Sequence, residues 1–256
     1  MSSADSTSAG GSWLSAARRG LSAARRRHAI ERLGPLEDVD IQLPRSGVTY
    51  RITKPNDIDT LLTIAENDPE ENLPYWAALW PSGVALADEI LAEPELIQSG
   101  RVLELGTGLG VTAMAALSVG ADLIISDYAN ESLQLAAYNI TENGFNEPAV
   151  MQMNWRDPSD KFRKLVGNGF PVVIAADVLY ELRDVEPLLE LANWIVAPGG
   201  LLWLAEPRRY SAGRFVELAE EQGWTDELVE REGPWPEMED TGVTVRVHRM
   251  RRPGSD

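Results

Sequence analysis

The chain has 256 residues, no cysteine and a formal net charge of −17. The absence of cysteine excludes disulfides, a thiolate nucleophile, zinc held by thiolates and an iron–sulfur cluster. Residues 1–30 carry a charge of +4 and the remaining residues −21, so no nucleic-acid partner is expected of this acidic body. Attraction of basic partners and simple solubility both remain explanations of the acidity.

Hydropathy and composition also bear on location. No run of about 18 apolar residues occurs, so no membrane span is expected, and the start of the chain lacks the apolar core of a signal peptide. The cysteine-free composition is compatible with a reducing compartment, and we expect a cytoplasmic protein. No metal site is expected.

The N-terminal residues 1–30 are rich in small residues and arginine, and the segment SAARR occurs twice. They predict a disordered basic arm or a short helix around Ala16–Arg32, either a solvated tail or a contact for an anionic surface or RNA. Alternation from Val39 to Thr53 predicts a β-hairpin with its turn at Pro44–Gly47. We therefore expect an arm (1–30), an extension with this hairpin (31–72) and one domain (73–256).

From residue 74 on, helix and strand patterns alternate, beginning with a helix that opens near Pro81–Ser82. Further helices are expected over Thr112–Gly120, Asn130–Gly144 with Asn130 as N-cap, Val185–Val196 and Ala212–Gly223. Strands are expected at residues 102–105 and at Ala121–Asp127, Ala149–Met153, Pro171–Asp177, Leu201–Ala205, Glu227–Glu230 and Thr244–Arg249. This alternation predicts an α/β fold, an open and largely parallel sheet with helices on both faces.

The segment Arg101–Val111, RVLELGTGLGV, predicts a strand, a tight turn and a helix start. Glycine is needed in such a turn because the backbone must bend sharply and let a ligand lie against the main chain. Dinucleotide folds use G-x-G-x-x-G, whereas Gly106, Gly108 and Gly110 are spaced G-x-G-x-G. A turn without any ligand is the plain alternative.

Two acids flank this turn and indicate its ligand. Glu104 lies on the strand just before the glycines and suits a cationic amino acid group, and Asp127 ends the next strand, where a carboxylate can accept both ribose hydroxyls. Together they predict S-adenosylmethionine (SAM) as the cofactor. Because no cysteine is present, its chemistry should be polar rather than radical.

Asp177 stands at the carboxyl end of the fourth strand, where open α/β sheets bind ligands, and Tyr180 follows it. The carboxylate could orient an amine and stabilise its developing charge, while the ring packs along the methylene stem. The alternative makes Asp177 a helix cap and Tyr180 a core residue. Similarly, Trp76 and Trp80 either pack in the core or wall the cofactor. Neither His28 nor His248 lies in these motifs, and we expect both to be structural or surface groups.

These residues resemble the class I SAM-dependent methyltransferases. Over about Leu73–Arg251 they are similar to the family of lysine methyltransferases that includes nicotinamide N-methyltransferase-like proteins. The resemblance is carried by Trp80 in LWPSG, residues 104–110 in ELGTGLG, Asp127, Trp155, and Asp177 to Tyr180 in ADVLYE. The glycine motif is shared by the whole superfamily, whereas D-x-x-Y together with LWPSG is more specific.

The resemblance implies a Rossmann-like, seven-stranded methyltransferase sheet, mostly parallel with its last strand antiparallel. It also implies that Trp80 lines the SAM pocket, that Asp127 holds the ribose and that Trp155 packs on adenine. The expected cofactor-binding set is Trp80, Glu104, Gly106, Thr107, Gly108, Gly110, Asp127, Tyr128, Asn154, Trp155 and Ala176, and the expected catalytic residues are Asp177 and Tyr180. Residues 1–72 and the loop Pro234–Thr241 depart from the family pattern.

The expected function is transfer of a methyl group from SAM to an amine, with a protein lysine as acceptor. In D/N-P-P-Y enzymes, which methylate adenine or glutamine amides, the two positions held here by Val178 and Leu179 are prolines, which argues against a planar nitrogen acceptor. A small-molecule N- or O-methyltransferase and a SAM-binding protein without turnover remain the alternatives.

Overall fold

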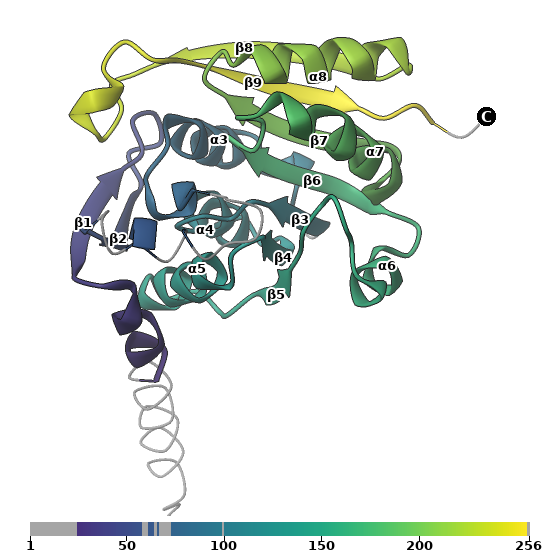
Figure 1. Ribbon diagram of the computed structural model, residues 1–256. Coiled ribbons are helices and arrows are strands. Elements are labelled where there is room, and N and C mark those ends of the chain that lie inside the picture. The colour runs from purple at the N-terminus through teal and green to yellow at the C-terminus, as the bar shows by residue number, and fades with distance from the viewer. Residues whose placement is uncertain (1–24, 58–60, 64–65, 67–72, 99, 255–256) are drawn as a thin grey trace, which may run out of the picture.

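The computed structural model describes residues 25–57, 61–63, 66, 73–98 and 100–254 (Figure 1). A seven-stranded sheet forms its centre, in the order β5-β4-β3-β6-β7-β9-β8. The strands are β3 (Arg101–Leu105), β4 (Asp122–Asp127), β5 (Ala149–Gln152), β6 (Phe170–Ala176), β7 (Val196–Glu206), β8 (Thr225–Glu232) and β9 (Thr244–Arg251). Neighbours from β5 to β7 pair in parallel, and β9 runs antiparallel to β7 and β8. The expected sheet with an antiparallel last strand is confirmed.

Helices cover both faces of this sheet. They are α3 (Pro81–Ala92), α4 (Val111–Ser118), α5 (Asn130–Glu142), α6 (Asp160–Val166), α7 (Val185–Ile195) and α8 (Tyr210–Glu221). Short 3-10 turns occur at η1 (Glu31–Leu33), η2 (Tyr75–Ala77), η3 (Pro94–Leu96), η4 (Leu182–Asp184) and η5 (Met238–Asp240).

Two hydrophobic cores follow from the period of two along each strand. On β6, Val172 and Ile174 join the core under α3, α4 and α5, whereas Val173 and Ala175 join the core under α6, α7 and α8. This explains why the central strands are apolar at nearly every position: they are buried on both faces. The sheet is thereby fixed, and the ends of its strands can carry polar groups.

The predicted hairpin is β1 (Leu36–Gln42) and β2 (Thr49–Pro55), which form a separate two-stranded antiparallel sheet. It lies beside α5 (Figure 1), where Asn139 accepts a hydrogen bond from the Thr53 amide at 2.9 Å and donates to the Thr53 carbonyl at 3.1 Å. The hairpin is therefore attached to the domain through its backbone.

Residues 25–30 are helical, which fits the helix alternative over residues 16–32, and Ile30 is fully buried. Arg26 contacts Glu147 at 3.1 Å and Arg32 contacts Glu131 at 3.1 Å, so this end of the predicted arm packs on the domain. Residues 1–24, which hold most of the predicted arm, the first SAARR segment and most of the second, lie outside the described residues. The division into arm, extension and domain stays a prediction.

Local differences from the expected elements have simple causes. Asn130 is not the N-cap of α5 but its first residue; Ala129 is the N-cap, and its amide donates to Asp127 Oδ1 at 3.0 Å instead. Helix α6 was not expected, although Ser159 caps it by accepting from the Phe162 amide at 3.3 Å. Strand β7 begins at Val196 rather than Leu201, because Val196 already pairs with Phe170 of β6; the register is irregular between this pair and Leu201, and Gly199 in between has φ +72°. Within the described ranges, no helix has the length and apolarity to cross a membrane.

Candidate active site

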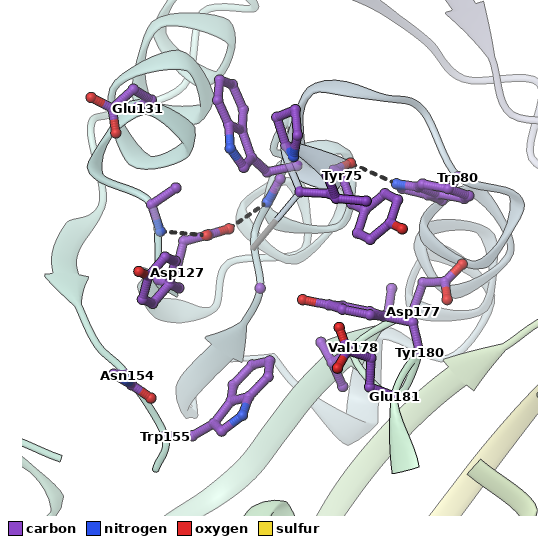
Figure 2. A pocket seen from close by; sticks show the side chains of 18 of the residues that line it. Tyr75, Trp80, Asp127, Glu131, Asn154, Trp155, Asp177, Val178, Tyr180 and Glu181 are labelled. Atoms are coloured by element: carbon purple, nitrogen blue, oxygen red, sulfur yellow. Dashed lines mark hydrogen bonds between the residues drawn. The ribbon is translucent and has the colours of Figure 1, made fainter. Parts of the chain in front are cut away.

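A cavity of about 610 Å³ opens at the carboxyl ends of β3, β4 and β6 (Figure 2). The predicted residues in its wall are Trp80, Gly106, Gly108, Asp127, Tyr128, Asn154, Trp155, Ala176, Asp177 and Tyr180. Glu104, Thr107 and Gly110 do not line it. Ligands of open α/β sheets bind at this edge, so the fold brings most of the predicted residues to one place.

The glycine turn forms the floor between β3 and α4. Gly106 has φ +66°, and a Cβ at this position would lie 2.9 Å from Val178 Cγ1, so no larger residue fits. Gly108 has φ +51°, and its amide donates to Asp127 Oδ2 at 3.1 Å. Gly110 lies behind the turn as the N-cap of α4. The turn thus presents bare main chain to the cavity.

Asp127, at the end of β4, is 8% exposed and is held by its own neighbourhood. Oδ1 accepts from the Ala129 amide at 3.0 Å, and Oδ2 accepts from Ser132 Oγ at 2.6 Å as well as from Gly108. Burial raises the pKa of Asp127, and these hydrogen bonds oppose that rise. The carboxylate is therefore fixed in orientation at the cavity wall.

Glu104 lies beneath the turn rather than in the wall. It is 2% exposed, and its Oε2 accepts from Thr107 Oγ1 at 2.7 Å. Burial raises the pKa of Glu104 to about 8, with Asp127 adding to the rise and the Thr107 bond opposing it. Its contact with a cationic amino group stays a prediction, and the role of Thr107 in the structure is to satisfy this buried acid.

Asn154 and Trp155 follow β5 and lie on the same side of the cavity as Asp127 (Figure 2). The Trp155 ring is half-buried, and its Nε1 is 3.5 Å from Asp184 Oδ1. Arg156 forms an ion pair with the same buried carboxylate. The indole is therefore positioned by a polar network around Asp184, and it lines the cavity.

Asp177 directly follows β6 on the other side of the cavity (Figure 2) and is 9% exposed. Its φ of +55° places a non-glycine residue in the left-handed region, a strain found where geometry is set for function. Its Oδ1 accepts from Arg209 Nε at 2.5 Å. Burial raises the pKa of Asp177 and Glu206 adds to the rise, while the Arg209 guanidinium lowers it.

Three aromatic rings stand beside this carboxylate (Figure 2). The Tyr75 ring lies edge-on to Tyr180 at 5.2 Å and to Trp80 at 6.0 Å between centroids, and Trp80 Nε1 donates to the Tyr75 carbonyl at 2.8 Å. Burial, with nearby acids adding, raises the pKa of Tyr180 to about 12, so its hydroxyl stays protonated near neutral pH. A carboxylate beside aromatic faces is a site for an organic cation.

The sequence left open whether Asp177 caps a helix, whether Tyr180 belongs to the core, and whether Trp76 and Trp80 pack in the core or line the cavity. Asp177 caps no helix among the described elements, since η4 begins after Glu181, and Tyr180 lies in a loop and lines the cavity rather than the core. Those two interpretations are wrong. Trp76 and Trp80 both line the cavity, and Trp76 also packs against the core.

The site residues named from the sequence did not include several cavity residues, chiefly Tyr75, Glu131, Glu181 and Arg209. Arg209 lies in the loop after β7, and β7 is the parallel neighbour of β6. The signal available in the sequence was this adjacency, because carboxyl ends of neighbouring parallel strands meet at one edge. His248 was expected outside the site, and it lies in β9 with Nδ1 2.7 Å from Asp226.

Comparison with known proteins gives a family match over residues 59–222, to the family described as lysine methyltransferase. The electron transfer flavoprotein beta subunit lysine methyltransferase of Rattus norvegicus is 32% identical over 138 residues, which are 53% of this chain and 51% of that protein. Protein-lysine methyltransferase METTL21E of Mus musculus is 29% identical over 154 residues, 57% of this chain and 63% of that protein. The matches thus span about half to two thirds of these relatives.

Solved structures share the fold. The N-methyltransferase NodS from Bradyrhizobium japonicum, solved with S-adenosyl-L-homocysteine, aligns with a TM-score of 0.53 and 16% identity, covering 77% of this chain and 96% of that one. Magnesium protoporphyrin IX methyltransferase from Synechocystis, with bound SAM, aligns with a TM-score of 0.51 and 15% identity, covering 78% and 85%. The family model covers more than half of the sequence, and its span contains the glycine turn, Asp127, Trp155 and Asp177. The chain belongs to the lysine methyltransferase family.

Proposed function

We propose that the protein transfers a methyl group from SAM to an amine and that the acceptor is a lysine side chain of a protein. The observation that carries the proposal is the division of one cavity into two ends. The bare glycine turn, Asp127 and Trp155 form a cofactor end, and Asp177 with Tyr75, Trp80 and Tyr180 forms an acceptor end.

The cofactor end fits SAM by its chemistry. Asp127 is a fixed acceptor for ribose hydroxyls, Trp155 offers a flat apolar face to adenine, and the glycine main chain leaves room for the methionine part. When bound, SAM supplies a methyl group already activated by its sulfonium. The named relatives are lysine methyltransferases, and the neighbours named above were solved with SAM or its product.

At the acceptor end the residues have a modest chemical task. A neutral amine needs its lone pair aligned with the breaking bond, and the charge that develops on its nitrogen needs a counter-ion. Asp177 provides that carboxylate, and its buried position excludes water from around it. The rings of Tyr75, Trp80 and Tyr180 suit the methylene stem and the cationic product. The protonated Tyr180 hydroxyl is a hydrogen-bond donor and not a base.

A test of the proposal is incubation of the full chain with tritium-labelled SAM and a size-fractionated cell lysate. Label in a discrete protein band that mass spectrometry assigns to N-methyllysine supports the proposal. Label confined to the small-molecule fraction favours a metabolite acceptor, and absence of label despite SAM binding favours a SAM-binding protein without turnover. Asp177→Asn is the matched control, because it should lose the label without losing the cofactor.

The acidity of residues 31–256 supports a basic protein partner rather than nucleic acid, since like charge repels phosphate backbones. A cytoplasmic location is part of the proposal and is supported by the cysteine-free composition.

A further inference from the structure

We propose that Arg209 is an internal occupant of the acceptor end and that a substrate amine reaches Asp177 only by displacing its guanidinium. The inference rests on the proposed function, since it concerns how the same cavity admits its acceptor. It assigns to Arg209 a role in acceptor specificity that the motifs do not indicate.

The geometry closes Asp177 to an incoming amine. Arg209 Nε lies 2.5 Å from Asp177 Oδ1, and the guanidinium carbon lies 5.9 Å from the centre of the Trp80 ring. The second carboxylate oxygen, Oδ2, is buried and has no hydrogen-bond partner among the described residues. The Asp177 side chain is only 5% exposed. With Arg209 in place, neither oxygen is open to a cation arriving through the cavity.

The guanidinium occupies the kind of place that a lysine ammonium would take. It has a carboxylate on one side and an aromatic face on the other, which is the arrangement that binds organic cations. Unlike an amine, a guanidinium in a protein keeps its proton, and its nitrogen lone pairs are delocalised over the cation, so it is a poor nucleophile toward a methyl donor. Arg209 therefore fills the acceptor end without becoming an acceptor itself.

The backbone holds both partners of this ion pair in position. Asp177 and Arg208 are the non-glycine residues with positive φ in the described part of the chain, at +55° and +57°. Arg208 points to β8, where its Nη2 lies 2.8 Å from Glu230 Oε2, and the Arg209 amide donates to the buried Glu206. These contacts fix a turn that directs one arginine outward and the next inward. The inward position of Arg209 is thus built into the loop.

The ion pair between Arg209 and Asp177 affects which acceptors can bind. Displacing Arg209 breaks a charge-assisted hydrogen bond, so the acceptor must bring compensating contacts of its own. A lysine on a protein surface can do so, whereas a free alkylamine has only its stem and charge. Large apolar side chains next to cavity residues are available for such contacts: Tyr210 is 77% and Leu182 is 58% exposed. Arg209 therefore favours a protein-borne lysine over small amines.

The test is a titration of the full chain with n-butylamine near neutral pH and without cofactor. Ligand-observed NMR measures the affinity for the amine. Wild type should bind the amine weakly, and Arg209→Gln should bind it roughly tenfold or more tightly, the size expected when a competing charged hydrogen bond is removed. Arg214→Gln removes the same charge from a partly exposed position on α8 that does not line the cavity, and it should behave as wild type. The double variant Arg209→Gln with Asp177→Asn should lose the gain.

Unchanged or weaker amine binding by Arg209→Gln would overturn the inference, and so would an equal gain in Arg214→Gln. Arg209→Met serves as a second variant, and thermal unfolding of each variant shows that it is folded. The proposed function is tested separately by labelled SAM. If Arg209→Gln gains amine binding while the wild-type protein transfers no methyl group, the displacement stands and the proposed function fails. If the wild-type protein methylates a protein lysine while Arg209→Gln gains no amine binding, the proposed function stands and the displacement fails.

Discussion

At the cofactor end of the cavity, Asp127 is held by the amides of Gly108 and Ala129 and by Ser132, whereas at the acceptor end the Asp177 carboxylate is paired with the side chain of Arg209. Each of these partners lies at most 19 residues from Asp127 in sequence, while Arg209 is 32 residues from Asp177. The cofactor end is organised mostly by nearby main chain, and the acceptor end is completed by a side chain from a distant loop.

The two ends therefore suit different tasks, cofactor binding and acceptor selection. A cofactor used in every turnover suits a rigid, locally encoded site. An acceptor that must be selected suits a site whose polar partner is exchangeable. Variants that alter one end and not the other therefore test whether the two ends have separate roles.

The largest effect is expected for Asp177→Asn. Loss of the carboxylate removes the counter-ion for the developing ammonium, and turnover should fall about 10²–10³-fold. Binding of SAM, measured by calorimetry, should be unchanged. If turnover with the true substrate stays at the wild-type level, the role assigned to Asp177 is wrong.

A second prediction concerns Asp127→Ala. Loss of charged hydrogen bonds to two ribose hydroxyls should weaken SAM binding roughly 100-fold. The control is Asp122→Ala, because Asp122 is exposed at the opposite end of the same strand β4. Equal affinities of the two variants in calorimetric titration would remove Asp127 from the cofactor site.

Trp155→Ala should have a smaller effect of the same kind. Loss of a stacking face for adenine should weaken SAM binding about tenfold. Trp194→Ala is the matched tryptophan control, since Trp194 packs on Phe162 away from the cavity. A loss of affinity shared by both variants would indicate a general packing defect rather than adenine recognition.

The smallest effect concerns stability and the buried Glu104. Its pKa is about 8 in the folded protein against 4.5 ordinarily, so the folded state binds the proton more tightly. Between these values the folded protein retains a proton that the unfolded chain releases, and stability falls as pH rises. Glu104→Gln should therefore be more stable than wild type at pH 8, by on the order of 1 kcal/mol or more, with the difference shrinking toward pH 5.

Thermal unfolding of the ligand-free protein at several pH values measures this effect. The exposed Glu142, at the end of α5, supplies the control variant Glu142→Gln. A Glu104→Gln curve parallel to wild type from pH 5 to pH 8 would show that Glu104 is ionised throughout.

The sequence predicts locally encoded features better than contacts between distant segments. The strands and the glycine turn are encoded by local periodicity and spacing, and they are found where expected within a few residues, apart from β7, which begins five residues early. Helix α6 was missed because it has only seven residues. The early start of β7 was missed because Pro198 interrupts the strand pattern.

The acceptor end was predictable only in part. Asp177 and Tyr180 belong to one short motif and were found, and both line the cavity. Arg209 and Tyr75 reach them from distant segments, and no local pattern reports a contact between side chains 32 residues apart or more. The same holds for Glu104, whose burial beneath the turn depends on how β3 and β4 pack rather than on the motif.

The most direct test of the account is calorimetric titration of the wild-type chain with S-adenosyl-L-homocysteine, repeated with Asp127→Ala and Asp177→Asn. The account predicts one binding site in the wild type, strongly weakened by the first variant and retained by the second. Absence of binding to the wild type, or equal loss in both variants, would contradict the assignment of the two ends of the cavity.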